Sequence, residues 1–191
     1  MITKIAEKVW KIKTNFLDAN VYLIDLDEPT LIDLGYHTDN KVVLTDLDSI
    51  GYSPKDVKRV IFTHLHSDHS GKPSDFPNAR FYASYQEIKN LKSMQMFFTY
   101  DAQATEFLNK TKLEPLREKI GPFEVIQTPG HTSGSVCLYL KENNLLFTGD
   151  TLFGKHTGRT DVPTGSDKEM DQSLKKLARF KAKLLPGHDY G

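Results

Sequence analysis

The sequence predicts a mixed α/β fold in which turns at the ends of strands carry metal-binding side chains. Short runs rich in β-branched and aromatic residues, such as VKRVIFTH at 57–64, alternate with segments of helical spacing, such as 166–181. Four strand-like segments run directly into turns that carry histidine or aspartate, and these turns hold five of the seven histidines. Ends of neighbouring strands meet at one rim of a sheet, where rigid scaffolds commonly mount catalytic loops. We therefore expect a single domain over residues 1–191 with its functional site at such a rim.

The N-terminal half should contribute five strands and the helices between them. Runs of β-branched and aromatic residues predict strands at 8–14, 20–26, 30–35, 57–64 and 79–84. A helix is expected at 38–51, where Thr38 or Asp39 can cap the start and Gly51 ends it. Helical spacing returns from Tyr85 to Asn109, and we expect this segment to form two helices.

The C-terminal half predicts three strands, a helix and a last strand. The three strands cover 124–131, 135–142 and 144–150, and a hairpin turn at Glu142–Asn144 joins the last two. Residues 166–181 mix both signs of charge at helical spacing, which is typical of a solvated amphipathic helix. A short strand at 182–188 follows this helix.

Composition narrows the class of function. The 191 residues include 25 basic and 25 acidic side chains, so no net charge draws the protein toward nucleic acid or an anionic membrane. Cys137 is the only cysteine, which excludes an intrachain disulfide, and its apolar run predicts a buried, unreactive thiol. The N-terminal residues lack the unbroken apolar stretch of a signal peptide. We expect a cytoplasmic monomer or homodimer that acts on a small molecule and binds neither nucleic acid nor membranes.

The stretch THLHSDHSG at 63–71 is the strongest chemical signal in the sequence. At the end of an extended segment His64 and His66 point the same way, and after a turn Asp68 and His69 can face a neighbouring position. Zinc normally takes three or four protein ligands, so each pair needs partners from elsewhere. Three later turns offer such partners, namely His131, Asp150 and His188.

Seven ligands, one of them a carboxylate that can bridge, suit two metal ions that share a water molecule. A site that only stabilises a fold usually closes its coordination shell with thiolates, and this chain has one cysteine. The other two histidines fall outside the pattern. We expect His37 to be a surface residue and His156 to border the site.

Four motifs resemble, in the same order, the signature of the metallo-β-lactamase superfamily. They are HxHxDH at 64–69, TPGHTSGS at 128–135, FTGD at 147–150 and PGH at 186–188. The resemblance implies a four-layer αββα sandwich with two stacked sheets and the metals at one edge of the sheets. It also implies a first ion on His64, His66 and His131, a second ion on Asp68, His69 and His188, and a bridge by Asp150.

The chemistry implied by the resemblance is hydrolysis at a pair of ions. Two ions about 3.5–4 Å apart hold a bridging hydroxide and polarise the substrate, and Asp68 would orient that nucleophile. Zinc is the first expectation for both ions. Iron and manganese are the alternatives, because nitrogen and carboxylate ligands accept all three metals.

The segment 147–166 indicates the subgroup of the superfamily that this chain resembles most. It resembles the corresponding stretch of glyoxalase II-like thioesterases, and its GRTD at 158–161 also resembles persulfide dioxygenases that bind a single iron. We expect Arg159 to pair with Asp161 and brace the loop, with contact to an anionic substrate group as the alternative. Candidate substrate contacts are Phe153, His156 and Arg159.

The substrate pocket is expected to be built from loops. Full-length glyoxalase II carries a C-terminal helical domain that helps to bind glutathione, whereas this chain ends three residues after His188, so we expect a short form without that domain. The loops in question are 35–38, 93–103 and 154–164. Within the second of these lie Met94, Met96, Phe97, Phe98 and Tyr100. We interpret this Met/aromatic stripe as core, with an apolar lid over the site as the alternative.

The leading prediction is a dinuclear hydrolase that opens a thioester or related activated acyl bond. A lactonase and a mononuclear iron persulfide dioxygenase are the alternative enzymes, and a metal-stabilised binding module is the non-catalytic alternative. Native β-lactam hydrolysis is disfavoured, because the best-known β-lactamases of the family carry a cysteine ligand in the TGD region, where this chain has Asp150.

Overall fold

Alternation of side chains along the strands gives each sheet two apolar faces. In β10 (Val136–Leu140), Val136 packs toward the other sheet, whereas the next residue, Cys137, packs toward helix α6 (Asp167–Leu177). The computed structural model describes residues 1–15 and 18–189 and repeats this alternation in the other central strands. A sheet that is apolar on both faces must be covered on both sides.

The first sheet contains seven strands in sequence order. The pairings are antiparallel up to β3–β4 and parallel from β4–β5 onward. Its strands are β1 (Ile2–Ala6), β2 (Val9–Ile12), β3 (Val21–Ile24), β4 (Thr30–Ile32), β5 (Arg59–Ile61), β6 (Arg80–Ala83) and β7 (Leu113–Pro115).

The second sheet contains five strands in the order β12-β11-β10-β9-β8. Only the β11–β12 pairing is parallel within this sheet. Besides β10, its strands are β8 (Lys119–Ile120), β9 (Phe123–Gln127), β11 (Leu145–Gly149) and β12 (Lys183–Pro186). The turn at Lys141–Asn144 joins β10 to β11 and confirms the predicted hairpin.

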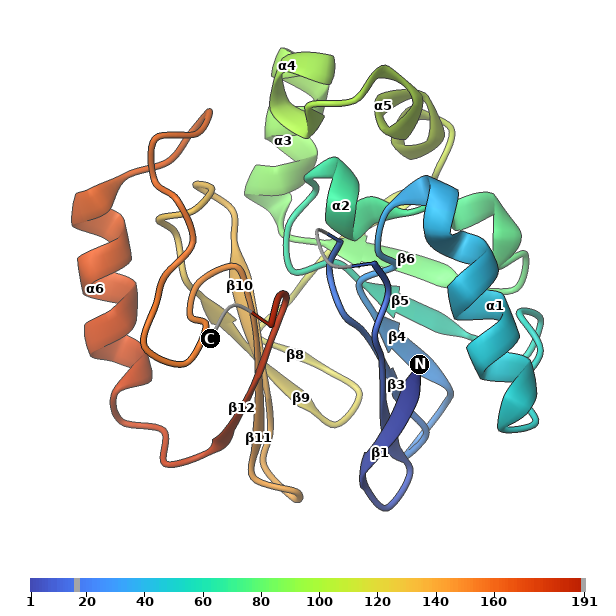
Figure 1. Ribbon diagram of the computed structural model, residues 1–191. Helices are drawn as coiled ribbons and strands as arrows, with labels where there is room; N and C mark the ends of the chain where they lie inside the picture. The colour runs from blue at the N-terminus through green and yellow to red at the C-terminus, as the bar shows by residue number, and fades with distance from the viewer. Residues whose placement is uncertain (16–17, 190–191) are drawn as a thin grey trace.

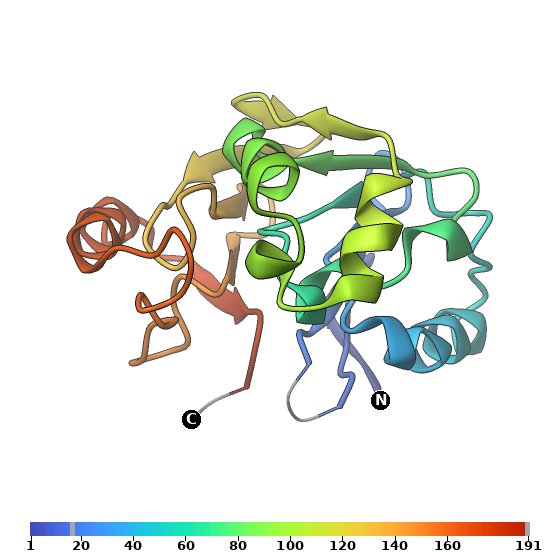
Figure 2. The ribbon, with the colours of Figure 1, turned by 90° about the horizontal axis from the view of Figure 1, so that it is seen from above.

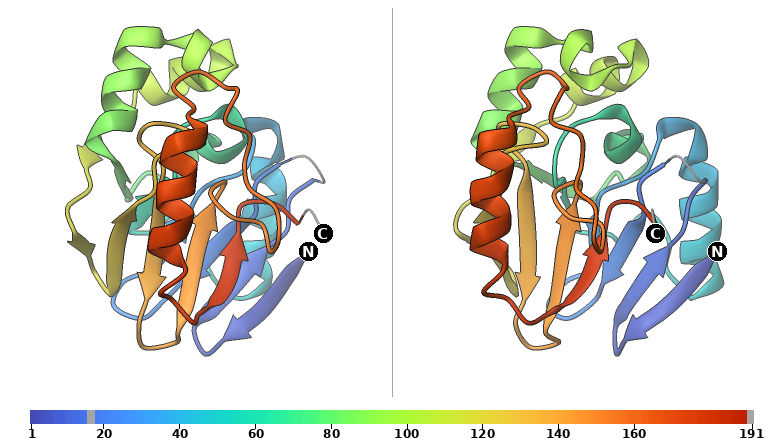
Figure 3. Two further views of the ribbon diagram at one scale, coloured as in Figure 1. Left: turned by 90° about the vertical axis from the view of Figure 1, so that its left-hand side faces the viewer. Right: turned by 60° about the vertical axis from the view of Figure 1, so that its left-hand side comes forward.

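Three apolar cores separate four layers (Figure 1). Helices pack on the outer face of the first sheet around Val43 and Phe62. The two sheets pack against each other around Leu138 and Phe147. Helix α6 covers the outer face of the second sheet around Leu177, as Figure 3 shows from the side. The four-layer αββα sandwich is therefore confirmed.

The helices near the two ends of the chain agree with the sequence prediction, whereas the one-turn helix α2 (Ser67–Ser70) was expected to be a turn and the segment after β6 differs as well. The helices are α1 (Asn40–Ser49), α2, α3 (Tyr85–Met94), α4 (Met96–Thr99), α5 (Ala102–Asn109) and α6. The prediction of two helices between Tyr85 and Asn109 was wrong, because there are three. Gln95 and Tyr100 adopt positive φ angles of 52° and 65°, which interrupt the helical path on either side of α4.

Two other expectations were also wrong, the second only in part. His37 is not a surface residue: its side chain is 8% exposed, and its Nε2 lies 3.5 Å from Oδ1 of Asp101. The Met/aromatic stripe is core only in part: Phe98 is buried and Met94 packs against the same core, whereas Met96, Phe97 and Tyr100 are exposed.

Three strands were missed by the sequence analysis. β7 and β8 are only three and two residues long, too short for a period-2 pattern to be read. β1 lies at the edge of its sheet and is only partly buried, so its sequence does not alternate clearly. Across residues 1–15 and 18–189, no helix combines the length and the hydropathy that a membrane crossing requires.

Candidate metal centre

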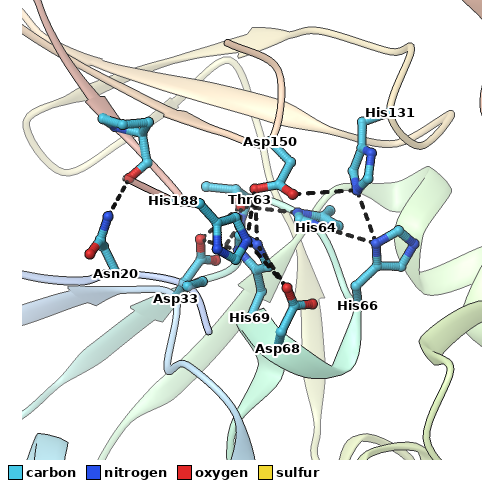
Figure 4. Close-up of polar contacts among 12 residues, drawn as sticks. Asn20, Asp33, Thr63, His64, His66, Asp68, His69, His131, Asp150 and His188 are labelled. Atoms are coloured by element: carbon cyan, nitrogen blue, oxygen red, sulfur yellow. Dashed lines mark hydrogen bonds and ion pairs between the residues drawn. The ribbon is translucent and has the colours of Figure 1, made fainter. Parts of the chain in front are cut away.

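All seven predicted ligand side chains come together at the rim shared by the two sheets (Figure 4). The first sheet supplies the segment after β5, which carries two histidines and then forms α2. The second sheet supplies the turns that follow β9, β11 and β12. The residues gathered in this way are His64, His66, Asp68, His69, His131, Asp150 and His188.

The first cluster consists of three imidazoles from both sheets. Nδ1 of His66 lies 3.2 Å from Nε2 of His64 and 3.0 Å from Nε2 of His131. Ligand atoms that surround one tetrahedral zinc at its usual bond lengths lie roughly 3.3 Å apart. The spacing of these nitrogens therefore fits a single cation placed between them.

The second cluster combines one carboxylate with two imidazoles. Nε2 of His188 lies 3.2 Å from Oδ2 of Asp68, and Nε2 of His69 lies 3.9 Å from the same oxygen. The Asp68 side chain is 32% exposed, whereas those of His69 and His188 are 0% and 3% exposed. Asp68 is thus the member of this cluster that faces the solvent.

Asp150 lies between the two clusters and directs one oxygen at each. Its Oδ1 lies 3.1 Å from Nε2 of His69 and 3.5 Å from Nε2 of His188. Its Oδ2 lies 3.7 Å from Nε2 of His131. A carboxylate in this position can bridge two cations.

Hydrogen bonds on the far side of two imidazoles turn their lone pairs toward the centre. Nδ1 of His131 lies 2.7 Å from the carbonyl oxygen of Arg159, and Nδ1 of His69 lies 2.8 Å from Oδ2 of Asp33. Both oxygens only accept, so each Nδ1 carries the proton and each Nε2 presents a lone pair to the centre. Such orientation of ligand histidines by outer partners is a regular feature of metal sites. The arrangement of donors fits bound metal ions.

Burial keeps the first cluster neutral. It lowers the pKa of His64 well below its ordinary value, and the neighbouring imidazoles of His69 and His66 lower it further. The same combination of burial and the adjacent His131 lowers the pKa of His66 to about 3. Neutral imidazole is the form that binds metal, so no proton competes at these two residues near neutral pH.

In the second cluster and at Asp150, neighbouring charges rather than burial determine the direction of the pKa shifts. Burial would lower the pKa of His69, but the carboxylates of Asp150, Asp33 and Asp68 outweigh it and raise this pKa well above the ordinary value. Burial would raise the pKa values of Asp68 and Asp150, but the adjacent His69 and His188 outweigh it and lower both. This half of the centre therefore attracts cations, including protons.

Asp33 holds the segment that follows β5 and was missed by the sequence analysis. Its Oδ1 accepts a hydrogen bond from the backbone N–H of Thr63 at 2.8 Å, and its Oδ2 accepts one from Oγ1 of Thr63 at 2.8 Å. Asp33 is 2% exposed and sits just after β4, where the sequence has a single carboxylate at the end of an apolar run. That isolated acidic residue was the available signal.

Glu87 on α3 was also missed, and it ties the two ligand-bearing segments of the first cluster together. Its Oε2 accepts a hydrogen bond from the backbone N–H of Leu65 at 2.7 Å, and its Oε1 accepts one from Oγ1 of Thr132 at 2.7 Å. Burial raises the pKa of Glu87 to about 7. In sequence, Ser84 and Glu87 have the spacing of a helix capping box, which conceals the inward role of the carboxylate.

Contacts between the sheets hold the turn that carries His188. Asn20 donates from its backbone N–H to the carbonyl of Gly187 at 2.6 Å and from Nδ2 to the carbonyl of Pro186 at 3.1 Å. A Cβ atom on Gly187 would lie 2.5 Å from Oδ1 of Asp150, so only glycine lets the chain pass this close to the centre.

The candidate substrate contacts differ in their relation to the centre. Arg159 forms the expected pair with Asp161, with Nε and one terminal nitrogen 2.9 and 3.0 Å from the two carboxylate oxygens. Phe153 is buried, and its ring lies 5.9 Å from that of His188. Together with the exposed His156 and with His188, Phe153 lines a cavity of about 720 Å³ beside the centre.

Comparison with known proteins identifies hydrolases with related sequences. The family model for the metallo-beta-lactamase superfamily matches residues 14–188. The chain is 32% identical over 183 residues to a probable metallo-hydrolase of Methanocaldococcus jannaschii, which covers 89% of this chain and 87% of that protein. It is 34% identical over 153 residues to hydroxyacylglutathione hydrolase of Rhodospirillum rubrum, covering 78% of this chain and 53% of that protein.

A third relative is the N-acyl homoserine lactonase of a Bacillus species, 30% identical over 169 residues, with 80% of this chain and 64% of that protein covered. The chain thus spans about half of the hydroxyacylglutathione hydrolase and somewhat less than two thirds of the lactonase.

Solved structures share the same architecture. A metallo-beta-lactamase family protein of Thermus thermophilus has a TM-score of 0.81 at 22% identity, covering 98% of this chain and 75% of that chain. A protein crystallised in a di-iron-bound form has a TM-score of 0.77 at 26% identity, covering 93% and 91%. The first of these supports the fold alone, and the second is a related protein that binds two irons.

Proposed function

Because this chain belongs to the metallo-β-lactamase superfamily and is related to a probable metallo-hydrolase, we propose that it uses two metal ions to hydrolyse a thioester or a related activated acyl bond. The observation that carries this proposal is the placement of Asp150, whose two oxygens face the two ligand clusters at 3.1 and 3.7 Å. Zinc is the metal we propose first, with iron or manganese as alternatives.

The chain's own residues have separate tasks in this reaction. Bound divalent ions would lower the pKa of a water molecule and polarise the carbonyl oxygen of the substrate. The ionised and solvent-facing Asp68 carboxylate accepts a hydrogen bond from the attacking water and orients it. The water oxygen bonds to the carbonyl carbon and the carbon–sulfur bond breaks. One proton of the water goes to the sulfur, and the other is released to the solvent. The products are a carboxylate and a thiol.

The relatives support an acyl bond as the target. Hydroxyacylglutathione hydrolase and N-acyl homoserine lactonase, to which this chain is 34% and 30% identical, are named for hydrolysis of a thioester and of a lactone. Both reactions add water to an activated carbonyl. A lactonase is therefore the second candidate function, and it differs from the first only in the leaving group.

A panel of substrates tests the proposal. Metal-free protein reconstituted with zinc should hydrolyse acyl thioesters, S-lactoylglutathione or simple lactones, with thiol or acid release as the readout. Asp68→Ala should reduce that hydrolysis strongly, whereas a metal-stabilised binding module would tolerate the change. Oxygen uptake with glutathione persulfide by protein holding one iron, with no hydrolysis of any ester, would favour the dioxygenase and overturn the proposal.

A further inference from the structure

Helix α4 exposes apolar side chains next to the metal centre. Met96, Phe97 and Tyr100 are 55%, 68% and 55% exposed, and they belong to the small set of large apolar side chains that face solvent in the described residues. Single exposed apolar residues are ordinary, but adjacent ones commonly mark a binding surface. We call Met96, Phe97 and Tyr100 the α4 patch.

The α4 patch is continuous with the first ligand cluster. The ring of Tyr100 lies 5.2 Å from the ring of His66, and the buried ring of Phe98 lies 5.8 Å from it on the underside of the helix. Figure 2, viewed from above, shows α4 with α3 and α5 nearest to the viewer, at the end of the sheets that carries the ligands. Tyr100 therefore brings one end of the α4 patch next to the first ligand cluster.

The residues at the two ends of α4 adopt strained backbone conformations. Gln95 and Tyr100, which bound the helix, both have positive φ, a conformation that side chains with a Cβ atom rarely adopt. Side-chain hydrogen bonds to α5 hold these ends in place: Oε1 of Gln95 accepts from Asn109 at 2.7 Å, and Thr99 bonds Thr105 at 2.6 Å. Strained residues persist where the surroundings fix them, and they concentrate at ligand clamps.

In the loop that follows β11, the guanidinium of Arg159 is paired. Burial raises the pKa of Tyr100, and the nearby charges of Arg159 and Asp161 act on this pKa in opposite directions. The guanidinium of Arg159 is already bound through two hydrogen bonds by the carboxylate of Asp161, so its charge is balanced. The α4 patch thus presents apolar side chains next to a balanced ion pair, which suits a hydrocarbon group better than an anionic one.

We propose that the α4 patch binds the apolar acyl chain of the substrate while its carbonyl group lies at the metal centre. The substrate class is then an acyl thioester or acyl lactone with a medium-length hydrocarbon chain. This inference rests on the proposed function for the position of the carbonyl. Binding of the chain itself can be measured without any turnover.

Calorimetric titration of the zinc-loaded protein with acetate, butyrate and octanoate tests the inference, since each is the carboxylate product of such a hydrolysis. One fully buried methylene tightens binding by roughly fourfold, and an open surface covers only part of each methylene. Octanoate should therefore bind about tenfold more tightly than butyrate. Phe97→Ala should remove most of this difference.

Tyr85→Ala is the matched control, because Tyr85 is 70% exposed on α3 and has no contact with the ligand clusters among those described. This variant should keep the preference for octanoate. Equal affinities for acetate and octanoate, or a preference that survives in Phe97→Ala, would overturn the inference. Hydrolysis of an acetyl thioester by the unaltered protein reports on the proposed function separately, since acetate has no chain to reach the patch.

Discussion

The two halves of the candidate metal centre use different types of ligand although both lie at the same rim of the sheets. The first half, His64, His66 and His131, presents only imidazole nitrogens, and its side chains are almost fully buried. The second half combines His69 and His188 with the carboxylate of Asp68, which is 32% exposed. The difference suggests a division of tasks in the proposed reaction: the first half would hold its ion with buried imidazoles, whereas the second half would present the solvent-facing Asp68 to the attacking water.

The support behind each half differs as well. Glu87 and the Arg159 carbonyl brace the first half from α3 and from the loop after β11. Asp33 braces His69 of the second half, and Asn20 holds the turn before His188 across the gap between the sheets. Glu87 and Asn20 each support one half, whereas Asp33 contacts His69 directly and also holds Thr63, which lies next to His64.

Removal of the bridge should have the largest effect, because Asp150 belongs to both halves. We expect Asp150→Ala to lower hydrolysis by more than about 100-fold, since it removes a direct ligand and losses of outer partners alone cost 10–100-fold. Metal counting by mass spectrometry should find fewer than two ions per chain. Asp171→Ala, which removes an exposed carboxylate on α6, should change neither quantity.

Loss of the hydrogen bond from His69 to Asp33 should weaken metal binding in the second half more than in the first. Asp33→Asn places an amide nitrogen where Oδ2 accepted hydrogen bonds from Nδ1 of His69 and Oγ1 of Thr63, while the remaining oxygen can still accept from the backbone N–H of Thr63. We expect affinity for the second ion to fall by about 10–100-fold, with a much smaller change at the first site. The control Asp25→Asn removes a carboxylate that bonds Tyr52 instead. Equal loss at both sites would contradict the separation of the halves.

Lowering the pH should release the metal ion of the second half before that of the first half. The pKa of His69 is raised, so in the metal-free protein a proton binds there and must leave when the ion enters, whereas the lowered pKa values of His64 and His66 leave those residues unprotonated. One displaced proton makes affinity for the second ion fall about tenfold for each pH unit below that pKa. Zinc titrations between pH 8 and 5.5 measure this slope, and equal slopes at both sites would contradict the comparison.

Glu87, which supports the first half, should make the free energy of unfolding depend on pH. Burial raises the pKa of Glu87 from 4.5 to about 7, so the folded metal-free protein retains a proton that the unfolded chain releases. The stability from this proton is complete below pH 4.5 and is lost as the pH rises through about 7. The loss is on the order of 3 kcal/mol for such a shift.

Glu87→Gln should abolish that contribution, as denaturant unfolding at several pH values would reveal. Glu142→Gln, in the exposed hairpin turn, is the control and should unfold with the pH dependence of the unaltered protein. Identical pH dependence in Glu87→Gln and the unaltered protein would contradict the assigned role of Glu87.

Most strands and all candidate ligands could be predicted from the sequence because both depend on local patterns, whereas the four layers were predicted from the resemblance to the superfamily. Alternation in segments such as Val136–Leu140 determines which face each side chain joins, and the ligands lie in turns directly after strands. Asp33 and Glu87 were missed because their partners, Thr63 and Thr132, lie about 30 and 45 positions away in the chain. The division of α3 from α4 was missed because a positive φ at Gln95 follows from tertiary contacts rather than from residue type.

Stepwise loading of the metal-free protein with zinc tests the two-ion account most directly. Hydrolysis of an acyl thioester is followed at each addition, and native mass spectrometry counts the ions bound to each chain. If the second half activates the water as proposed, activity should stay low up to one zinc per chain and reach its maximum at two. Full activity at one ion per chain, with the second half empty, would contradict the account.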